Sequence, residues 1–152
     1  MLDNEYRRGV YALIIKDDTS VLLVQKRSNG LWDFPGGGIE ESESTEQAAR
    51  REIKEELGVT NIELVAISSI TNKYLWDKDE IGKHLTKTGI LKKGQEQFFV
   101  ILRLADDYSI TLQTEELLDY KWVSLLELAE HMSYPDQFPI IQQVLVEAGI
   151  YS

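Results

Sequence analysis

The chain has 152 residues, of which 43% are hydrophobic, and this length and composition suit one domain spanning residues 1–152. The absence of cysteine excludes disulfides and thiolate metal sites. No apolar run approaches the roughly 20 residues of a membrane span, and no signal peptide is evident, so we expect a cytoplasmic protein with no membrane partner. The net charge of −10 argues against a broad nucleic-acid-binding surface, and it would repel a polyanionic substrate unless cations intervene.

The first third of the chain predicts two strands, a glycine-rich loop and a helix. The stretch "GVYALIIKDDTSVLLVQKR" (9–27) has two apolar runs joined by a turn at residues 16–19. Residues 28–42 are a loop with a short extended piece around Trp32 and Phe34. Residues 44–57 predict a helix, because Gly58 stands where a C-terminal glycine cap would lie.

The rest of the chain predicts further strands followed by two late helices. Residues 62–75 and 95–105 are strand-like, and 120–123 form a short strand. Between the first two, residues 73–94 carry six lysines without a clear period and are interpreted as a loop. Ser124 and Glu127 have capping-box spacing, which places a helix from there to about His131, and Asp136 begins a last helix ending near Gly149. The order favours an α+β fold with helices packed on a mixed sheet.

Three glutamates gather on one face of the helix predicted at 44–57. At about 100° per residue, Glu55 and Glu56 lie within roughly 60° on either side of Glu52. Glu56 also borders the apolar stripe formed by Ala49, Ile53 and Leu57. Like charges at this spacing repel by roughly 0.2–0.5 kcal/mol per pair, so the presence of three glutamates on one face requires an explanation. A solvated acidic face is one explanation, and a hard divalent cation such as Mg²⁺, which takes carboxylate oxygens, is the other.

The residues around this helix have a distinctive spacing: Gly37, five residues, Glu43, seven residues, Arg51-Glu52-Ile53, one residue, Glu55-Glu56, one residue, Gly58-Val59. This pattern resembles the sequence box of the Nudix hydrolases at every position. The resemblance implies an α/β/α sandwich around a central mixed sheet, with the box as loop, helix and loop. It also implies an enzyme that hydrolyses a nucleoside diphosphate linked to another group, by attack of water at phosphorus.

The resemblance also implies roles for residues of the box. Glu52, Glu55 and Glu56 would be ligands of Mg²⁺, with Mn²⁺ as an alternative, and one of them, or a hydroxide that they hold, would activate the water. Arg51 would orient a carboxylate through a bidentate pair, the alternative being an ordinary surface salt bridge. The Gly36 carbonyl is a candidate metal contact. The structural residues of the motif are Gly37, Glu43, which could also be a ligand, and Gly58.

Candidates outside the box are less specific. Glu116, with Glu115 as the neighbouring alternative, precedes the strand at 120–123 and matches the family's extra metal ligand or base; an exposed loop acid is the other explanation. The arginines at strand ends are candidate phosphate contacts, the alternative being plain surface charge. Trp32 is a candidate for base stacking or for core packing. The lysine-rich loop is a candidate flap over the distal phosphates of the substrate. The remaining candidates for substrate binding are Arg7, Arg8, Arg27, Lys87, Lys92 and Lys93.

The order of motifs bears on the substrate. Tyr6-Arg7, Gly94-Gln95-Glu96-Gln97 and Tyr120-Lys121-Trp122-Val123 follow the order of dinucleoside polyphosphate hydrolases and RNA 5′-pyrophosphohydrolases. The expected partner is therefore a nucleotide or dinucleotide, or the 5′ end of an RNA. The segment "FPGGG" instead resembles the nucleoside triphosphate pyrophosphohydrolases, so a (d)NTP is an alternative. A non-catalytic Nudix-like binding domain is a second alternative, which the intact glutamates argue against. The sequence carries no signal of oligomeric state.

Overall fold

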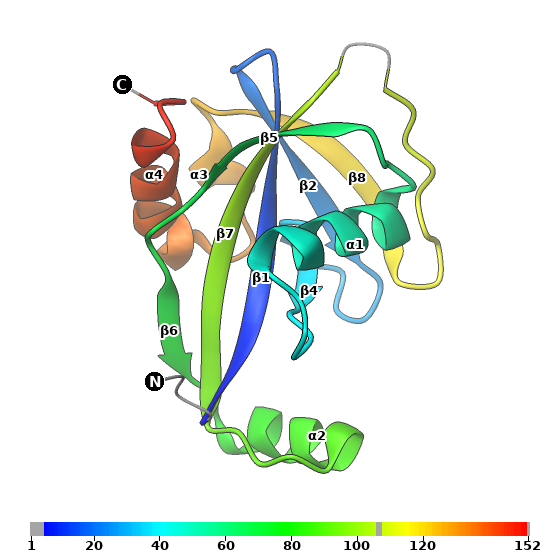
Figure 1. Ribbon diagram of the computed structural model, residues 1–152, viewed down its shortest axis with the longest axis vertical. Coiled ribbons are helices and arrows are strands. Elements are labelled where there is room, and N and C mark those ends of the chain that lie inside the picture. The colour runs from blue at the N-terminus through cyan, green and yellow to red at the C-terminus, as the bar shows by residue number, and fades with distance from the viewer. Residues whose placement is uncertain (1–4, 106–107, 152) are drawn as a thin grey trace.

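The computed structural model describes residues 5–105 and 108–151, in which eight strands form one mixed sheet. Two long parallel strands, β1 (Tyr6–Lys16) and β7 (Gly94–Leu104), form its centre (Figure 1). β2 (Ser20–Lys26) returns antiparallel to β1 through a turn in which Asp17 and Asp18 have φ values of 56° and 52°. The Thr19 N–H donates to the Lys16 carbonyl at 3.2 Å, so the turn expected at 16–19 is confirmed.

The other strands extend this centre on both sides. β8 (Leu117–Ser124) pairs with β2, while β5 (Ile62–Ile67) and β6 (Asn72–Leu75) both pair antiparallel with β7. β5 and β6 replace the single strand expected at 62–75, and β8 is longer than the strand expected at 120–123. Two short strands complete the sheet, β3 (Trp32–Asp33) on β2 and β4 (Gly36–Gly38) on β1.

Helices cover both faces of the sheet, which makes the predicted sandwich (Figure 1). α1 (Thr45–Leu57) packs on one face, and α3 (Leu128–His131) and α4 (Phe138–Glu147) pack on the other. Alternate residues of β1 supply both cores: Val10, Ala12 and Ile14 face α1, while Leu13 and Ile15 face α4. No helix in the described ranges is both long and apolar enough to cross a membrane.

α1 has the boundaries that the sequence predicts. The Ser44 side chain accepts a hydrogen bond from the Gln47 N–H, and the Gln47 side chain accepts one from the Ser44 N–H, which makes a capping box. At the other end Gly58 adopts φ 66° and its N–H donates to the Lys54 carbonyl. Local sequence chemistry therefore places both ends of the helix that carries the glutamates.

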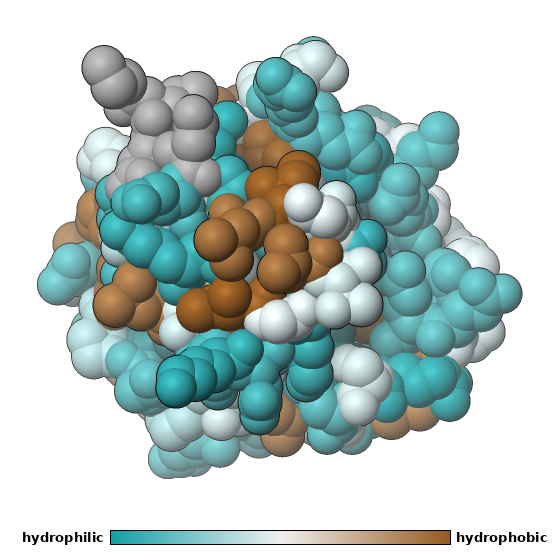
Figure 2. Space-filling model, turned by 90° about the horizontal axis from the view of Figure 1, so that it is seen from below, coloured by the Kyte–Doolittle hydropathy of each residue, from teal (hydrophilic) through white to brown (hydrophobic). Residues whose placement is uncertain are grey.

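The segment interpreted as a lysine-rich loop instead contains a helix, α2 (Lys78–Thr88). Asp77 caps its N-terminus by accepting the Glu80 N–H, and Gly89, at φ 74°, ends it. The prediction was wrong because α2 buries none of its side chains, so it lacks the apolar period that marks a packed helix. Figure 2, which views the molecule from the side on which α2 lies, shows an exposed apolar patch; the exposed large apolar residues of this region are Leu75, Leu85, Ile90 and Leu91.

The capping box predicted at Ser124 is also wrong. Ser124 is the last residue of β8, and its hydroxyl accepts a hydrogen bond from the Leu126 N–H instead of capping a helix. α3 begins only at Leu128 and lasts four residues. The last helix is preceded by a 3₁₀ turn, Pro135–Gln137, so α4 begins two residues after the expected Asp136.

Candidate active site

Glu56 is the most deeply buried of the three clustered glutamates. Its side chain is 2% exposed, and it lies between the end of β2 and the start of β4. Lys26 Nζ is 3.2 Å from Glu56 Oε1, and the Gly36 N–H donates to Oε2 at 3.1 Å. Burial raises the pKa of Glu56 to about 7, with Glu52 adding to the increase and Lys26 opposing it. This carboxylate is therefore held in place while its charge remains only partly compensated.

Glu52 lies against the glycine strand β4. A Cβ atom at residue 37 would overlap Glu52 Oε1, so any residue other than glycine would force this carboxylate to shift. Burial raises the pKa of Glu52, and the charges of Glu55 and Glu116 add to this effect. Glu55 itself is 58% exposed. Glu116 is exposed directly before β8. Two of the glutamates thus line the interior of the site, while Glu55 and Glu116 lie toward solvent.

Arg51 ties the box together. Its guanidinium forms a bidentate pair with Glu43, at 2.7 and 2.9 Å, and donates to the Gly38 carbonyl at 2.8 Å. A further contact of 2.9 Å joins Arg51 Nη1 to Glu52 Oε1. The pair with Arg51 lowers the pKa of Glu43. Arg51 and Glu43 therefore connect the loop before α1 to Glu52, and they fix where this carboxylate lies.

The donor set fits a hard divalent cation. Glu52 and Glu56 are two half-buried or buried carboxylates whose pKa values both rise on burial, so a cation beside them would offset their desolvation. No three acidic or histidine side chains of the described ranges already surround a common point. Instead, Arg51 and Lys26 each hold one carboxylate. If a divalent cation binds here, Glu52 and Glu56 are the carboxylates that would hold it, with the more exposed Glu55 and Glu116 as further candidates.

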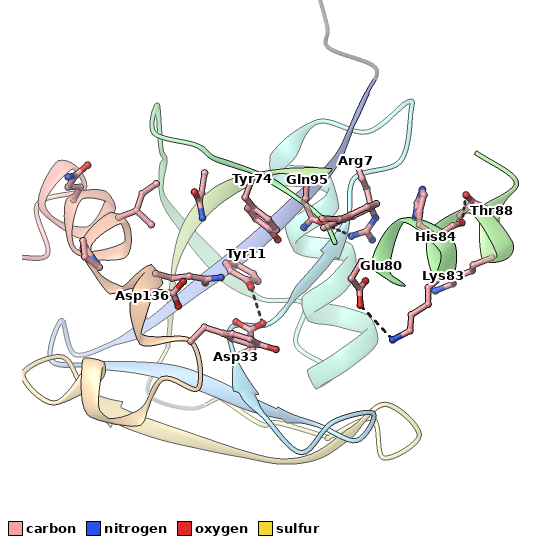
Figure 3. Close-up of a pocket in the computed structure, with 18 residues that line it drawn as sticks. Arg7, Tyr11, Asp33, Tyr74, Glu80, Lys83, His84, Thr88, Gln95 and Asp136 are labelled. Atoms are coloured by element: carbon pink, nitrogen blue, oxygen red, sulfur yellow. Dashed lines mark hydrogen bonds and ion pairs between the residues drawn. The ribbon is translucent and has the colours of Figure 1, made fainter. Parts of the chain in front are cut away.

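Two adjacent cavities lie beside these carboxylates, although Glu52 and Glu56 belong to neither wall. The smaller, about 190 Å³, is lined by Lys26, Gly36 and Gly37. The larger, about 1150 Å³, extends between α2 and the turn before α4 (Figure 3). The two share four wall residues: Arg7, Tyr11, Asp33 and Gln95. The cavities therefore adjoin at these four residues, and the smaller one reaches Lys26 and Gly36, which contact Glu56, and Gly37, which lies against Glu52.

Polar groups at the junction of the cavities are tied to one another. Arg7 Nη1 donates to Gln95 Oε1 at 3.0 Å, and the Tyr11 hydroxyl donates to Asp33 Oδ2 at 2.9 Å (Figure 3). Burial raises the pKa of the Asp33 carboxyl. The junction thus presents one cation and one carboxylate, both with fixed positions.

The structure brings some of the predicted substrate-binding residues to the cavities and not others. Arg7 lines both cavities, and Lys87 lines the larger one from α2. Arg8, the next residue on the same strand, points to the opposite face, where its guanidinium carbon lies 5.0 Å from the centre of the Phe98 ring. The other predicted residues line neither cavity. Arg27 donates to the Thr114 carbonyl, and Lys93 pairs with Glu5. The Trp32 ring is covered by Lys121, and Lys92 is absent from both cavity walls.

The sequence did not reveal several residues of the site. Lys26 precedes the predicted Arg27 by one residue, and the alternation of a strand implies that only one of the two can face Glu56. Asp33, Tyr74 and Tyr134 line the larger cavity from separate elements. No local pattern brings such residues together, because their proximity depends on how the strands pair and where the C-terminal segment packs.

Burial of Glu56 predicts that the metal-free protein loses stability as the pH rises. The pKa increases from 4.5 to about 7 on folding, so between these values the folded state binds more protons than the unfolded state. This group's contribution is therefore complete below about pH 4.5 and is lost through pH 7, by up to about 3 kcal/mol. Urea unfolding in EDTA at about pH 5 and pH 8 should show this loss in the wild type.

Glu56→Gln isolates this contribution, because an amide does not titrate in this range. The difference between the wild type and Glu56→Gln should change with pH, while Glu46→Gln, on the same helix and paired with Arg50, should follow the wild type. Parallel pH profiles for the wild type and Glu56→Gln would contradict the assignment.

Comparison with known proteins agrees with this geometry. A model of the NUDIX domain matches residues 5–144. An RNA pyrophosphohydrolase from Campylobacter jejuni subsp. doylei is 31% identical over 142 residues, which cover 88% of each chain. An RNA pyrophosphohydrolase from Helicobacter pylori (strain G27) is 29% identical over 153 residues, covering 95% of this chain and 94% of that one.

Solved structures share the fold. The E. coli dihydroneopterin triphosphate pyrophosphohydrolase superposes with a TM-score of 0.70 at 23% identity, covering 93% of this chain and 98% of that one. A C. elegans Ap4A hydrolase has a TM-score of 0.64 at 19% identity, covering 90% and 93%. The family match spans the sheet, the box helix and most of α4. The chain therefore belongs to the Nudix family of pyrophosphohydrolases.

Proposed function

We propose that this enzyme hydrolyses, with Mg²⁺ or Mn²⁺, a phosphoanhydride bond in a dinucleoside polyphosphate or in the 5′-triphosphate end of an RNA. One observation carries the proposal. Lys26 and Gly36, which contact Glu56, line a small cavity that shares Arg7 with a cavity of about 1150 Å³, and two lysines of α2, Lys83 and Lys87, line the larger one. The relatives named as RNA pyrophosphohydrolases support the same choice.

The residues of the box would perform the chemistry from fixed positions. A bound divalent cation would neutralise the diphosphate, lower the pKa of a water and stabilise the leaving oxygen. Glu52 and Glu56 would hold it, with Glu55, Glu116 and the Gly36 carbonyl as further candidate ligands or bases. Arg51 keeps Glu52 oriented, and the Gly36 N–H keeps Glu56 oriented, so that neither carboxylate must reorganise during the reaction.

The remainder of the substrate would lie along the two cavities. Arg7, at their junction, is positioned to meet a phosphate. Tyr74 and Tyr134 offer aromatic surface for a base in the larger cavity. Lys87 and Lys83, the latter paired with Glu80 at 3.8 Å (Figure 3), would supply positive charge for phosphates or a second nucleotide beyond the first. The helix α2 would thus contact the distal phosphates, the role that the sequence analysis assigned to a flap.

A panel of substrates tests the proposal. We expect kcat/KM for diadenosine tetraphosphate or triphosphorylated RNA to exceed that for every single (d)NTP, because only the longer substrates reach the lysines of α2. A (d)NTP preferred by tenfold or more would favour nucleotide-pool cleaning, as "FPGGG" suggested. Tight binding without turnover of any substrate would favour a non-catalytic domain.

The α2 lysines provide a matched test of the same idea. Lys83→Ala/Lys87→Ala should raise KM for the long substrate, most strongly at low salt, since exposed charges are screened as ionic strength increases. Lys78→Ala/Lys92→Ala removes the same charge from the same segment at residues that do not line the cavity. An equal change of KM in both double variants would show that only net charge matters.

A further inference from the structure

Lys26 makes the only cationic contact recorded for Glu56 within the described residues. It comes from the end of β2, where it lines the smaller cavity, whereas Glu56 belongs to α1, so the contact joins the sheet to the helix beside this cavity. The lysine side chain is 27% exposed and the glutamate 2%. One partner of this ion pair can therefore move into solvent or into the cavity, while the other cannot.

The position of the ammonium group matters for metal binding. The Gly36 N–H already donates to Oε2, and Lys26 Nζ approaches Oε1. A cation held by Glu56 would meet the positive charge of Lys26 at close range and in a partly buried environment, where repulsion is stronger than in water. Lys26 and a metal ion therefore compete for the same carboxylate.

We propose that Lys26 is a stand-in cation: it holds Glu56 in position in the metal-free enzyme and, once the metal is bound, turns to the phosphates of the substrate. This inference rests on the proposed metal-dependent function. Lys26 is thus a positioning residue for Glu56 in one state and a phosphate contact in the other. The second contact is within reach because Lys26 lines the same small cavity as Arg7, Gly36 and Gly37.

The neighbouring cations are not placed for this role. Arg7 is engaged with Gln95, and Arg27 donates to the Thr114 carbonyl. A lysine also suits an exchange better than an arginine would, because its single ammonium on a flexible stem leaves a carboxylate more readily than a bidentate guanidinium does. The side-chain chemistry at position 26 should therefore control how strongly the protein itself competes with the metal.

Two variants of Lys26 should shift metal affinity in opposite directions. Lys26→Met removes the competing charge, so Mn²⁺ should bind about five- to tenfold more tightly, the order expected for one charge at a partly exposed site. Lys26→Arg should hold Glu56 more firmly and weaken Mn²⁺ binding. Lys26→Met should also raise KM for substrate at saturating metal, because a phosphate contact is lost.

The experiment measures free Mn²⁺ by electron paramagnetic resonance in substrate-free protein. It compares the wild type, both Lys26 variants and Arg27→Met, which removes the same charge one residue away. If Lys26→Met binds Mn²⁺ no more tightly than Arg27→Met does, the inference is overturned. It is also overturned if Lys26→Met binds Mn²⁺ more weakly than the wild type and has a raised KM, because a lysine with a purely structural role would produce that result. If Lys26→Met does not fold, Lys26→Arg decides: binding as tight as the wild type overturns the inference. Absence of Mn²⁺ binding by every protein, the wild type included, would instead defeat the proposed metal-dependent function.

Discussion

Replacement of Glu56 by glutamine lowers kcat by at least about 10²- to 10³-fold and leaves the fold intact. Glutamine keeps the size of the side chain and can still accept the Gly36 N–H, but it removes the negative charge that a metal ion requires. The loss should appear in kcat with the long substrate at saturating Mg²⁺. Far-ultraviolet circular dichroism and the unfolding midpoint report whether the structure is retained.

Two comparisons make this test decisive. Glu46→Gln lies on the same helix but pairs with Arg50 near the first turn, and it should retain wild-type turnover. Excess EDTA should abolish the activity of the wild type. Full activity of Glu56→Gln, or of the wild type in EDTA, would exclude the mechanism that we propose.

Replacement of Gly36 by alanine is expected to destabilise the protein by roughly 3 kcal/mol or to prevent folding. The new Cβ would overlap the carbonyl oxygen of Val10 and lie 3.2 Å from the Tyr11 Cα. Both contacts are with the backbone of β1, and Val10 is fully buried, so the strand cannot move aside. Urea unfolding measures the change in the free energy of unfolding.

Gly82 in α2 offers the matched control. A Cβ there meets no atom within 4 Å, and the residue lies inside a helix. Gly82→Ala should therefore stabilise the protein slightly, by at most about 0.5–1 kcal/mol, since alanine favours helices. Equal effects of Gly36→Ala and Gly82→Ala would show that the close approach of β4 to β1 carries no constraint.

Features that depend on neighbouring residues could be predicted from the sequence. The ends of α1 follow from Ser44 and Gly58, and the gathering of its glutamates follows from helical spacing. The burial of Glu56 was also implied, because it borders the apolar stripe of the helix. In these cases the interactions that decide the structure lie within a few residues of each other.

Features that depend on tertiary contacts could not be predicted. Lys26 and Glu56 are 30 residues apart, and only the packing of α1 on the sheet brings them together. Arg7 and Arg8 looked equivalent in sequence, yet a strand directs adjacent side chains to opposite faces, so one of them reaches the cavities. α2 was not predicted because it has capping residues at both ends but no buried apolar face.

The absence of buried side chains on α2 also bears on how this enzyme can change. The backbone amides of such a helix should exchange with deuterium through local opening, long before those of β1 and β7, which lie in the middle of the sheet. Insertions and deletions there would leave both cores untouched. The wall that we propose for the far end of the substrate is thus free to change in length and charge, so descendants of this gene could acquire new substrates while they keep the glutamates of α1.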